Sequence, residues 1–465
     1  MSLLKAGWLF GACLGLLVGC ADPAPSESSG PAVQGTQEDL KVEITPRALV
    51  HPIATLPNLP AGVAGDNQVL FVGSPLEGRV LAMSRVGNLQ IGELPQPPDG
   101  FILPFMMHQI GPRRMAVLDA GGLPSPLPFE PANPRIYEYS YSFTGGFHAT
   151  LERVVSFEDV LVGFAEDIAY LGNGRYLLSD AVLGAIWLVD SDGTVKPGIV
   201  PESMAPEDQI EKLAFCDTMP LITVGGVPFL FSGSTLPGVS PLAVRGGNLF
   251  FYNPCAEGLF KVPLSVFFDG RAPHARAADI SLVSAKPANV PVEQLLALAF
   301  NPNEPSDPYL YAADSLQLRL IRVDTRNGRR QVIADDPELF NFPSSTAFLP
   351  AVLGKSALIV VSNQQHLTPI TNDASEGDAF DLPFTVTEVD SVLGCWALLG
   401  VDGGAGTSSP SPSPSPSPSP SPSPSPSKVH VNANRCAVNV NVNVNRYAVN
   451  LNEASSRRPS LTLTA

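Results

Sequence analysis

The chain is poor in basic residues and lacks the motifs of several common enzyme classes. Its 465 residues include 28 Lys and Arg against 44 Asp and Glu, a formal net charge of −16. Because phosphate binding requires clustered basic side chains, this balance argues against nucleic acid as a partner. No G-x-S-x-G, H-E-x-x-H or Walker-type sequence occurs, so the serine hydrolase, zincin and NTPase classes have no support.

Long hydrophobic runs are also missing. Beyond the N-terminus, no stretch reaches the roughly 18 apolar residues that a membrane-spanning helix needs. Residues 1–20 combine Lys5 with an apolar core, which is typical of a signal peptide. The segment ends in Leu-Val-Gly-Cys and resembles a bacterial lipobox, in which Cys20 would be acylated. Ordinary signal cleavage after Cys20 is the alternative. We therefore expect export, either as a bacterial membrane lipoprotein or to the cell surface.

Cysteine is scarce, with six residues in the chain. Cys216 lies just before one of the sequence repeats described below, and Cys255 lies in a loop inside it. A disulfide between them would suit an exported protein, and two free buried thiols are the alternative. No pair has the C-x-x-C spacing of a zinc or redox site.

What the sequence does contain is a repeated pattern of short strands and turns. The clearest copy spans residues 164–196, where apolar runs alternate with turns such as Asn173-Gly174 and Asp192-Gly193. These dipeptides favour the type I′ turns of antiparallel hairpins. Sheets of this size, repeated six times, predict an all-β fold, a six-bladed β-propeller over residues 44–401. Looser copies cover residues 68–88, 114–146, 241–270, 296–330 and 345–372, and residues 384–399 add further strand.

The segments that flank the repeats have biased compositions. Residues 21–43 are rich in Pro, Ser and Gly and predict a disordered tether. Residues 402–428 are a low-complexity Ser-Pro linker, and residues 429–465 form a low-complexity tail that alternates Val and Asn. This alternation could at best give an aggregation-prone edge strand. Ser-Pro runs also look like the arabinogalactan modules of cell-surface glycoproteins, which is a competing interpretation.

Two segments carry a resemblance to a known family: EDIAYLGNGRYLLSDAVLGAIWLVDSDG, from Glu166, and SPLAVRGGNLFFYNPCAEGLFKVP, from Ser240. They resemble blades of the regucalcin/gluconolactonase and strictosidine-synthase-like propellers of the NHL/TolB-like superfamily. The resemblance implies an axial divalent metal, usually calcium, held at the starts of the inner strands. Carried over by position, Glu166, Ser240, Leu296 and Ser344 occupy these places in blades three to six. The nearest polar pair in the first blade is Asp66-Asn67. Calcium takes six to eight oxygen ligands, and this set supplies few.

These positions give the candidate site residues. Glu166 is the candidate catalytic residue and metal ligand, as a general base or through a bound cation. A strand-start acid satisfied by backbone N–H groups is the alternative. His108 is interpreted as a buried, hydrogen-bonded core histidine. Capping of turns is the alternative role for the residues that end the second strands of the blades. Those residues are Asp119, Asp180, Asn253, Asp314 and Asn363, and the candidate binding residues are Asp180, Ser240, Asn253, Asp314 and Ser344.

The leading functional hypothesis is an exported, membrane-anchored and monomeric binding module. A small molecule or a protein would bind at the channel mouth and at the long loops of residues 121–133 and 220–239, where a propeller carries specificity. The first alternative is a calcium-dependent lactonase or esterase-like hydrolase that uses Glu166. The second is a cell-surface glycoprotein that carries an arabinogalactan-type module.

Overall fold

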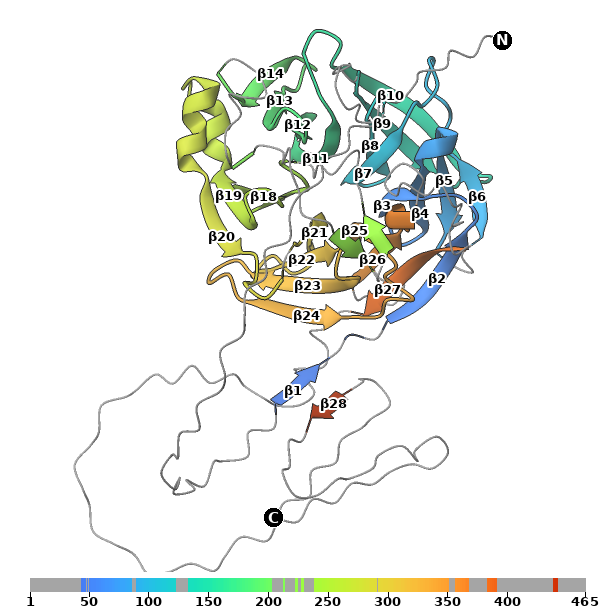
Figure 1. Cartoon of the computed structure of the whole chain (residues 1–465). Coiled ribbons are helices and arrows are strands. Elements are labelled where there is room, and N and C mark those ends of the chain that lie inside the picture. The colour runs from blue at the N-terminus through green and yellow to red at the C-terminus, as the bar shows by residue number, and fades with distance from the viewer. Residues whose placement is uncertain are drawn as a thin grey trace, which may run out of the picture. The chain divides into compact units, whose positions relative to one another are not determined.

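Strands dominate the part of the chain that the computed structural model describes, and six four-stranded antiparallel sheets surround one axis within it (Figure 1). The prediction of an all-β, six-bladed β-propeller is therefore confirmed. The described residues are 43–46, 48, 50–85, 89–122, 133–202, 212–213, 222–224, 227–229, 238–290, 292–350, 356–367, 383–390 and 438–441.

Five blades are simple meanders, in which the spatial order of the four strands is their order along the chain. Each second strand is an apolar run that ends in a turn, as the sequence repeats predict. The first blade consists of β3 (Ala61–Gly65), β4 (Val69–Ser74), β5 (Arg79–Ser84) and β6 (Gln90–Glu93). The second consists of β7 (Pro104–Gly111), β8 (Arg114–Asp119), β9 (Arg135–Ser142) and β10 (His148–Ser156). The third consists of β11 (Ala165–Gly172), β12 (Arg175–Asp180), β13 (Ala185–Val189) and β14 (Val195–Ile199). The fourth consists of β17 (Leu242–Arg245), β18 (Asn248–Asn253), β19 (Gly258–Pro263) and β20 (Ser281–Ala285). The fifth consists of β21 (Leu295–Phe300), β22 (Tyr309–Asp314), β23 (Arg319–Asp324) and β24 (Arg330–Ala334).

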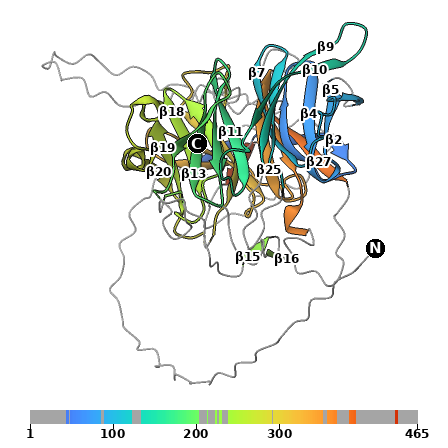
Figure 2. The same ribbon diagram turned by 90° about the horizontal axis from the view of Figure 1, so that it is seen from above.

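The sixth blade closes the ring with strands from both ends of the propeller. It consists of β25 (Pro343–Pro350), β26 (Ser356–Ser362), β27 (Phe384–Asp390) and the N-terminal strand β2 (Val50–Leu56). β2 pairs antiparallel with β27, so that Val50 lies opposite Val389. The inner strands contact one another in the cyclic order β3, β7, β11, β17, β21 and β25, and the view from above shows the blades side by side (Figure 2).

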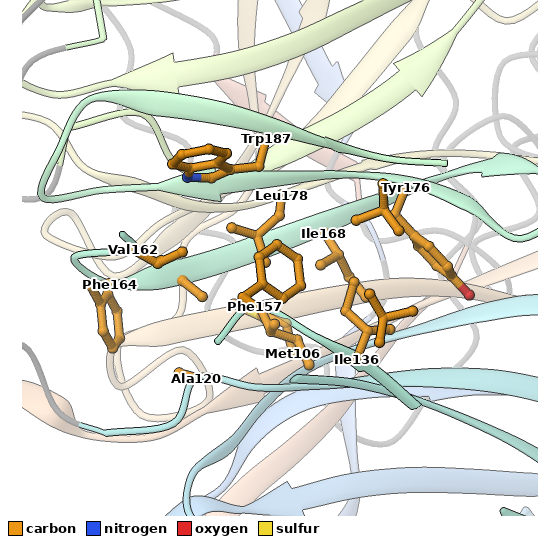
Figure 3. Close-up of a cluster of buried hydrophobic side chains, with 14 of the residues drawn as sticks. Met106, Ala120, Ile136, Phe157, Val162, Phe164, Ile168, Tyr176, Leu178 and Trp187 are labelled. Atoms are coloured by element: carbon orange, nitrogen blue, oxygen red, sulfur yellow. The ribbon is translucent and has the colours of Figure 1, made fainter. Parts of the chain in front are cut away.

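The core lies between neighbouring blades. Because each blade is covered on both faces, its middle strands read as continuous apolar runs, such as the fully buried Ala185–Val189 of β13. Between the second and third blades, Met106 and Ile136 pack against Ile168 and Leu178 (Figure 3). Burial of apolar surface at six such interfaces is the main stabilising term, at about 25 cal/mol per Å².

Short elements and the chain ends complete the described residues. The strands β1 (Glu43–Pro46) and β28 (Val438–Asn441) form a two-stranded sheet, and β15 (Ile222–Val224) pairs with β16 (Val227–Phe229). No helix in the described part of the chain is long and apolar enough to cross a membrane. The predicted signal peptide, with Cys20, and the Ser-Pro linker lie outside the described residues. Short 3-10 helices are η1 (Pro75–Glu77), η4 (Leu264–Phe268), η5 (Pro273–Asp279) and η6 (Gln365–Leu367).

Candidate functional site

Near the start of the inner strands lies a common backbone irregularity, a β-bulge. In five blades the pairing register shifts around the second residue of the inner strand. Ser240 stands at the corresponding place in the fourth blade, just before β17, and its N–H donates to the carbonyl oxygen of Tyr252. A bulge leaves one residue unpaired and redirects its side chain. The six equivalent residues, here called the bulge ring, are Gly62, Phe105, Glu166, Ser240, Leu296 and Ser344.

The bulge ring does not fit a calcium ion. It carries one carboxylate and two hydroxyl groups, whereas calcium takes six to eight oxygens that include several carboxylates. The first blade cannot contribute, because Gly62 has a φ of 65° and a Cβ there would lie 2.5 Å from the carbonyl oxygen of Phe105. Among the residues that the structure describes, no three His, Cys, Asp or Glu side chains are grouped so as to hold a metal.

Asp66, the polar residue nearest to the missing first-blade ligand, has a structural role. Its Oδ1 accepts hydrogen bonds from the backbone N–H groups of Gln68 and Val69, at 2.7 and 3.0 Å. Its Oδ2 accepts one from the hydroxyl of Tyr141 at 3.0 Å. Asp66 therefore shapes the turn after β3 and ties the first blade to the second.

Glu166 belongs to the bulge ring, as the sequence alignment of the blades predicts, and it is buried with 5% of its surface exposed. Burial raises the pKa of Glu166 to about 8; the hydroxyl of Ser240 opposes this shift and the charge of Asp167 adds to it. The side chain is therefore a neutral acid at pH 7. A protonated carboxyl group is a poor general base and a poor metal ligand, so the predicted catalytic and metal-binding roles lack support from its surroundings.

The residues that end the second strands cap turns. Asp180 is fully buried and accepts hydrogen bonds from four backbone N–H groups, two before β11 and two after β12. Asp119 repeats this pattern with three N–H groups, and Asn253 accepts two. Asn363 accepts one such bond, from the N–H of Gln365. These contacts support the turn-capping alternative for Asp180 and Asn253 over the predicted binding role.

Asp314 shares this position but pairs differently. Its Oδ2 accepts hydrogen bonds from Arg319, with the Nε at 2.8 Å, and its Oδ1 has no partner among the described residues. Burial raises the pKa of Asp314 to about 7, and repulsion from Glu293 adds to the shift. Because Asp314 is fully buried, no atom of it is available to a ligand.

Of the two cysteines in the predicted disulfide, the structure describes only Cys255. Cys255 is disulfide-bonded, and its N–H donates to Oδ1 of Asn253 at 2.8 Å in the turn that follows β18. Cys216 lies outside the described residues, so the pairing of these two cysteines stays a prediction.

The open part of the axis is a cavity of about 560 Å³, to which all six inner strands contribute. This volume lies within the range of about 300 to 1,000 Å³ that is usual for small-ligand sites. Its wall is mainly apolar and includes Met107, Leu242 and Phe348. Among the residues that the structure describes, no Asp, Glu, Lys or Arg side chain lines it, and the titratable groups in its wall are His108 and Tyr170. Glu166 and the two serines of the bulge ring are not part of this wall.

His108 differs from its sequence interpretation. Its side chain is 33% exposed and lines the cavity, so the interpretation as a buried core residue was wrong. It is hydrogen-bonded, as expected: its Nε2 lies 3.0 Å from Oδ1 of Asp167 in the next blade. The apolar neighbours of His108 in FMMHQI had suggested a buried position instead of one at the cavity wall. A usable signal was its place on an innermost strand, where alternate residues face the axis.

Comparisons with known proteins add a likeness in fold. No family model matches the sequence, and no curated protein matches it. The structure is similar to regucalcin, a calcium-binding protein from Agrobacterium tumefaciens, at 15% identity over 75% of this chain and 95% of that chain, with a TM-score of 0.43. It is also similar to a gluconolactonase from Xanthomonas campestris, at 10% identity over 77% and 99%, with a TM-score of 0.42. A luciferin-regenerating enzyme matches at 14% identity over 77% and 98%, with a TM-score of 0.43. At these identities the likeness concerns the fold alone.

Proposed function

We propose that the protein is an exported β-propeller that binds a small, uncharged and largely apolar molecule in its axial cavity. The observation that carries this proposal is the cavity of about 560 Å³, in whose wall the described residues include no carboxylate or basic aliphatic side chain. A charged ligand would lose its hydration there without gaining an ion pair. An apolar molecule would gain from burial against Met107, Leu242 and Phe348.

The proposal includes the location and assembly of the protein. Acylation of Cys20 would tether a monomeric propeller to a membrane through residues 21–43. Mass spectrometry of the membrane-associated protein tests this part, because the mature N-terminus would be a lipid-modified Cys20. A soluble protein with an unmodified N-terminus after cleavage would contradict it. A calcium-dependent lactonase is not favoured, because the bulge ring supplies one carboxylate.

Binding of an uncharged fluorescent probe tests the ligand class. We expect N-phenyl-1-naphthylamine, whose emission rises in apolar surroundings, to bind the purified protein saturably. Replacing Ala299, which lines the cavity, by Trp should weaken binding about tenfold or more. The matched control is Ala278→Trp, since Ala278 is exposed on η5. Equal binding by both variants, or no binding by the unaltered protein, would contradict the proposal.

A further inference from the structure

We propose that His108, held in place by Asp167, is a general base that shifts a proton between carbon atoms of a small uncharged ketone. The inference rests on the proposed function, since the ketone would occupy the same axial cavity. It assigns an activity to a pair of residues in neighbouring blades that no sequence motif marks.

Asp167 sets the tautomer of the imidazole. Its Oδ1 accepts a hydrogen bond from the N–H of Ile168 at 2.8 Å, and its Oδ2 accepts one from the N–H of Leu242 at 2.8 Å. Because backbone N–H groups already donate to both of its oxygens, the Asp167 carboxyl group acts as an acceptor toward His108 as well. The hydrogen between Asp167 and His108 therefore belongs to Nε2, so that Nδ1 is the ring atom that can act as the base.

The pair is rigid because three blades hold it. Asp167 in the third blade contacts His108 in the second and the backbone of Leu242 in the fourth. Its own N–H donates to Oγ of Ser179 at 3.0 Å, and the Ser179 hydroxyl donates to its carbonyl oxygen. Asp167 is 4% exposed, so water does not compete for these bonds. Such support fixes the ring direction, which a general base requires.

The basic atom is available to a ligand. Nδ1 of His108 makes no hydrogen bond to any residue that the structure describes, and it is not among their buried, unpaired polar atoms. Since the side chain lines the cavity and is 33% exposed, a bound molecule can reach Nδ1. Among the described residues, the cavity wall includes no Ser, Cys or Lys, and its one aliphatic hydroxyl group, that of Thr346, is buried.

Because Nδ1 of His108 is exposed to the cavity and the Thr346 hydroxyl is buried, the site favours reactions that one base completes alone. Nδ1 would take a proton from the carbon beside the carbonyl group of a β,γ-unsaturated ketone. The electrons of the broken C–H bond form a C=C bond, and those of the C=O bond move onto the oxygen. The imidazolium then returns the proton to the γ carbon, which gives the conjugated ketone and the free base. Nothing is oxidised or reduced, and no group leaves.

The test uses the full-length protein in chelator with 5-nitrobenzisoxazole, an uncharged probe. When a base removes its C–H proton, the N–O bond breaks and a coloured phenolate forms. Positioned general bases contribute about 10² to 10⁴ in rate, so His108→Gln should lose about a hundredfold or more of the rate above buffer. The unaltered protein should also exchange the α protons of 2-tetralone with deuterium, followed by NMR, and His108→Gln should not.

Asp167 is a positioning residue, and Asp167→Asn should lower kcat with little change in KM. Binding of N-phenyl-1-naphthylamine by each variant shows whether the cavity is intact. A protein that binds this probe but does not exceed the buffer rate would overturn the proposed base and leave the binding function standing. An undiminished rate in His108→Gln would overturn it too. Failure of the unaltered protein to bind the probe would instead overturn the proposed function.

Discussion

The third and fifth blades share one backbone design and differ in the chemistry it carries. Each is a four-stranded meander with a bulge near the start of the inner strand and an Asp at the end of the second strand. The bulge residue is a buried acid, Glu166, in the third blade and Leu296, in an apolar cluster with Phe342, in the fifth. The repeat therefore fixes the backbone and leaves the side chain at the bulge free to vary.

The two strand-end carboxylates make the same point. Asp180 is satisfied by four backbone N–H groups. Within the described part of the chain, Asp314 instead has one ion pair, with Arg319, and an oxygen without a partner. Equivalent positions thus range from a structural cap to a buried acid paired with an arginine. A site cannot be transferred between blades, or from another propeller, by alignment alone.

The largest expected change in unfolding free energy distinguishes Asp180 from Asp314. Asp180→Ala should lower the unfolding free energy by about 3 kcal/mol or more, because it leaves several buried N–H groups unpaired. Asp314→Ala should cost less, about 1 to 2 kcal/mol, because the side chain of Arg319 is 22% exposed and can be hydrated once its partner is removed. Urea denaturation measures both variants. Equal losses would show that the two aspartates have the same structural role.

An exchange at the bulge ring sharpens the comparison. Leu296→Glu should destabilise the protein by about 2 to 4 kcal/mol, because it places a carboxyl group among Val224, Leu316 and Phe342. Glu166→Leu should be close to neutral or stabilising, since it removes a buried polar group. Thermal and urea unfolding of both variants test this asymmetry, and a large loss in Glu166→Leu would indicate polar contacts that Glu166 alone provides.

Glu166 should also give the third blade a pH dependence. Because burial raises its pKa from 4.5 to about 8, between these values the unfolded chain releases a proton that the folded chain keeps. The unfolding free energy therefore falls as the pH rises from 4.5 to 8, by at most about 1.4 kcal/mol per pH unit, and Glu166 adds no further change above 8. Glu166→Gln should remove this part of the slope. Denaturation at a series of pH values compares the two proteins, and parallel curves would contradict the assignment.

The smallest expected effect is that of calcium. A bound ion would raise stability by RT ln(1 + [L]/Kd), about 2.7 kcal/mol at a hundredfold excess over Kd. With one carboxylate in the bulge ring, we expect the same thermal midpoint in calcium and in chelator. A clear rise with calcium that persists in Glu166→Gln would locate an ion elsewhere in the chain, and a rise lost in that variant would restore the axial site.

The sequence predicted the fold well because turn signals such as Asn173-Gly174 and buried apolar runs are local. It also placed Glu166, Ser240, Leu296 and Ser344 at equivalent positions, since a bulge at the strand start recurs in phase with the repeat. The cavity was not predictable. Its lining depends on how the six inner strands meet. The contact between His108 and Asp167 was not predictable either, because the two residues lie in different blades.

The closing strand sets an order of events for the young polypeptide. β2 leaves the ribosome before the other strands of the six blades, yet its partner β27 follows only after almost the whole propeller has been made. Until then β2 has an unpaired edge, and the sixth blade has no outer strand. Nascent chains that stop short of β27 should remain open rings, sensitive to proteases and to the strand edges of other chains. The propeller therefore completes its folding only in chains that have been synthesised through β27.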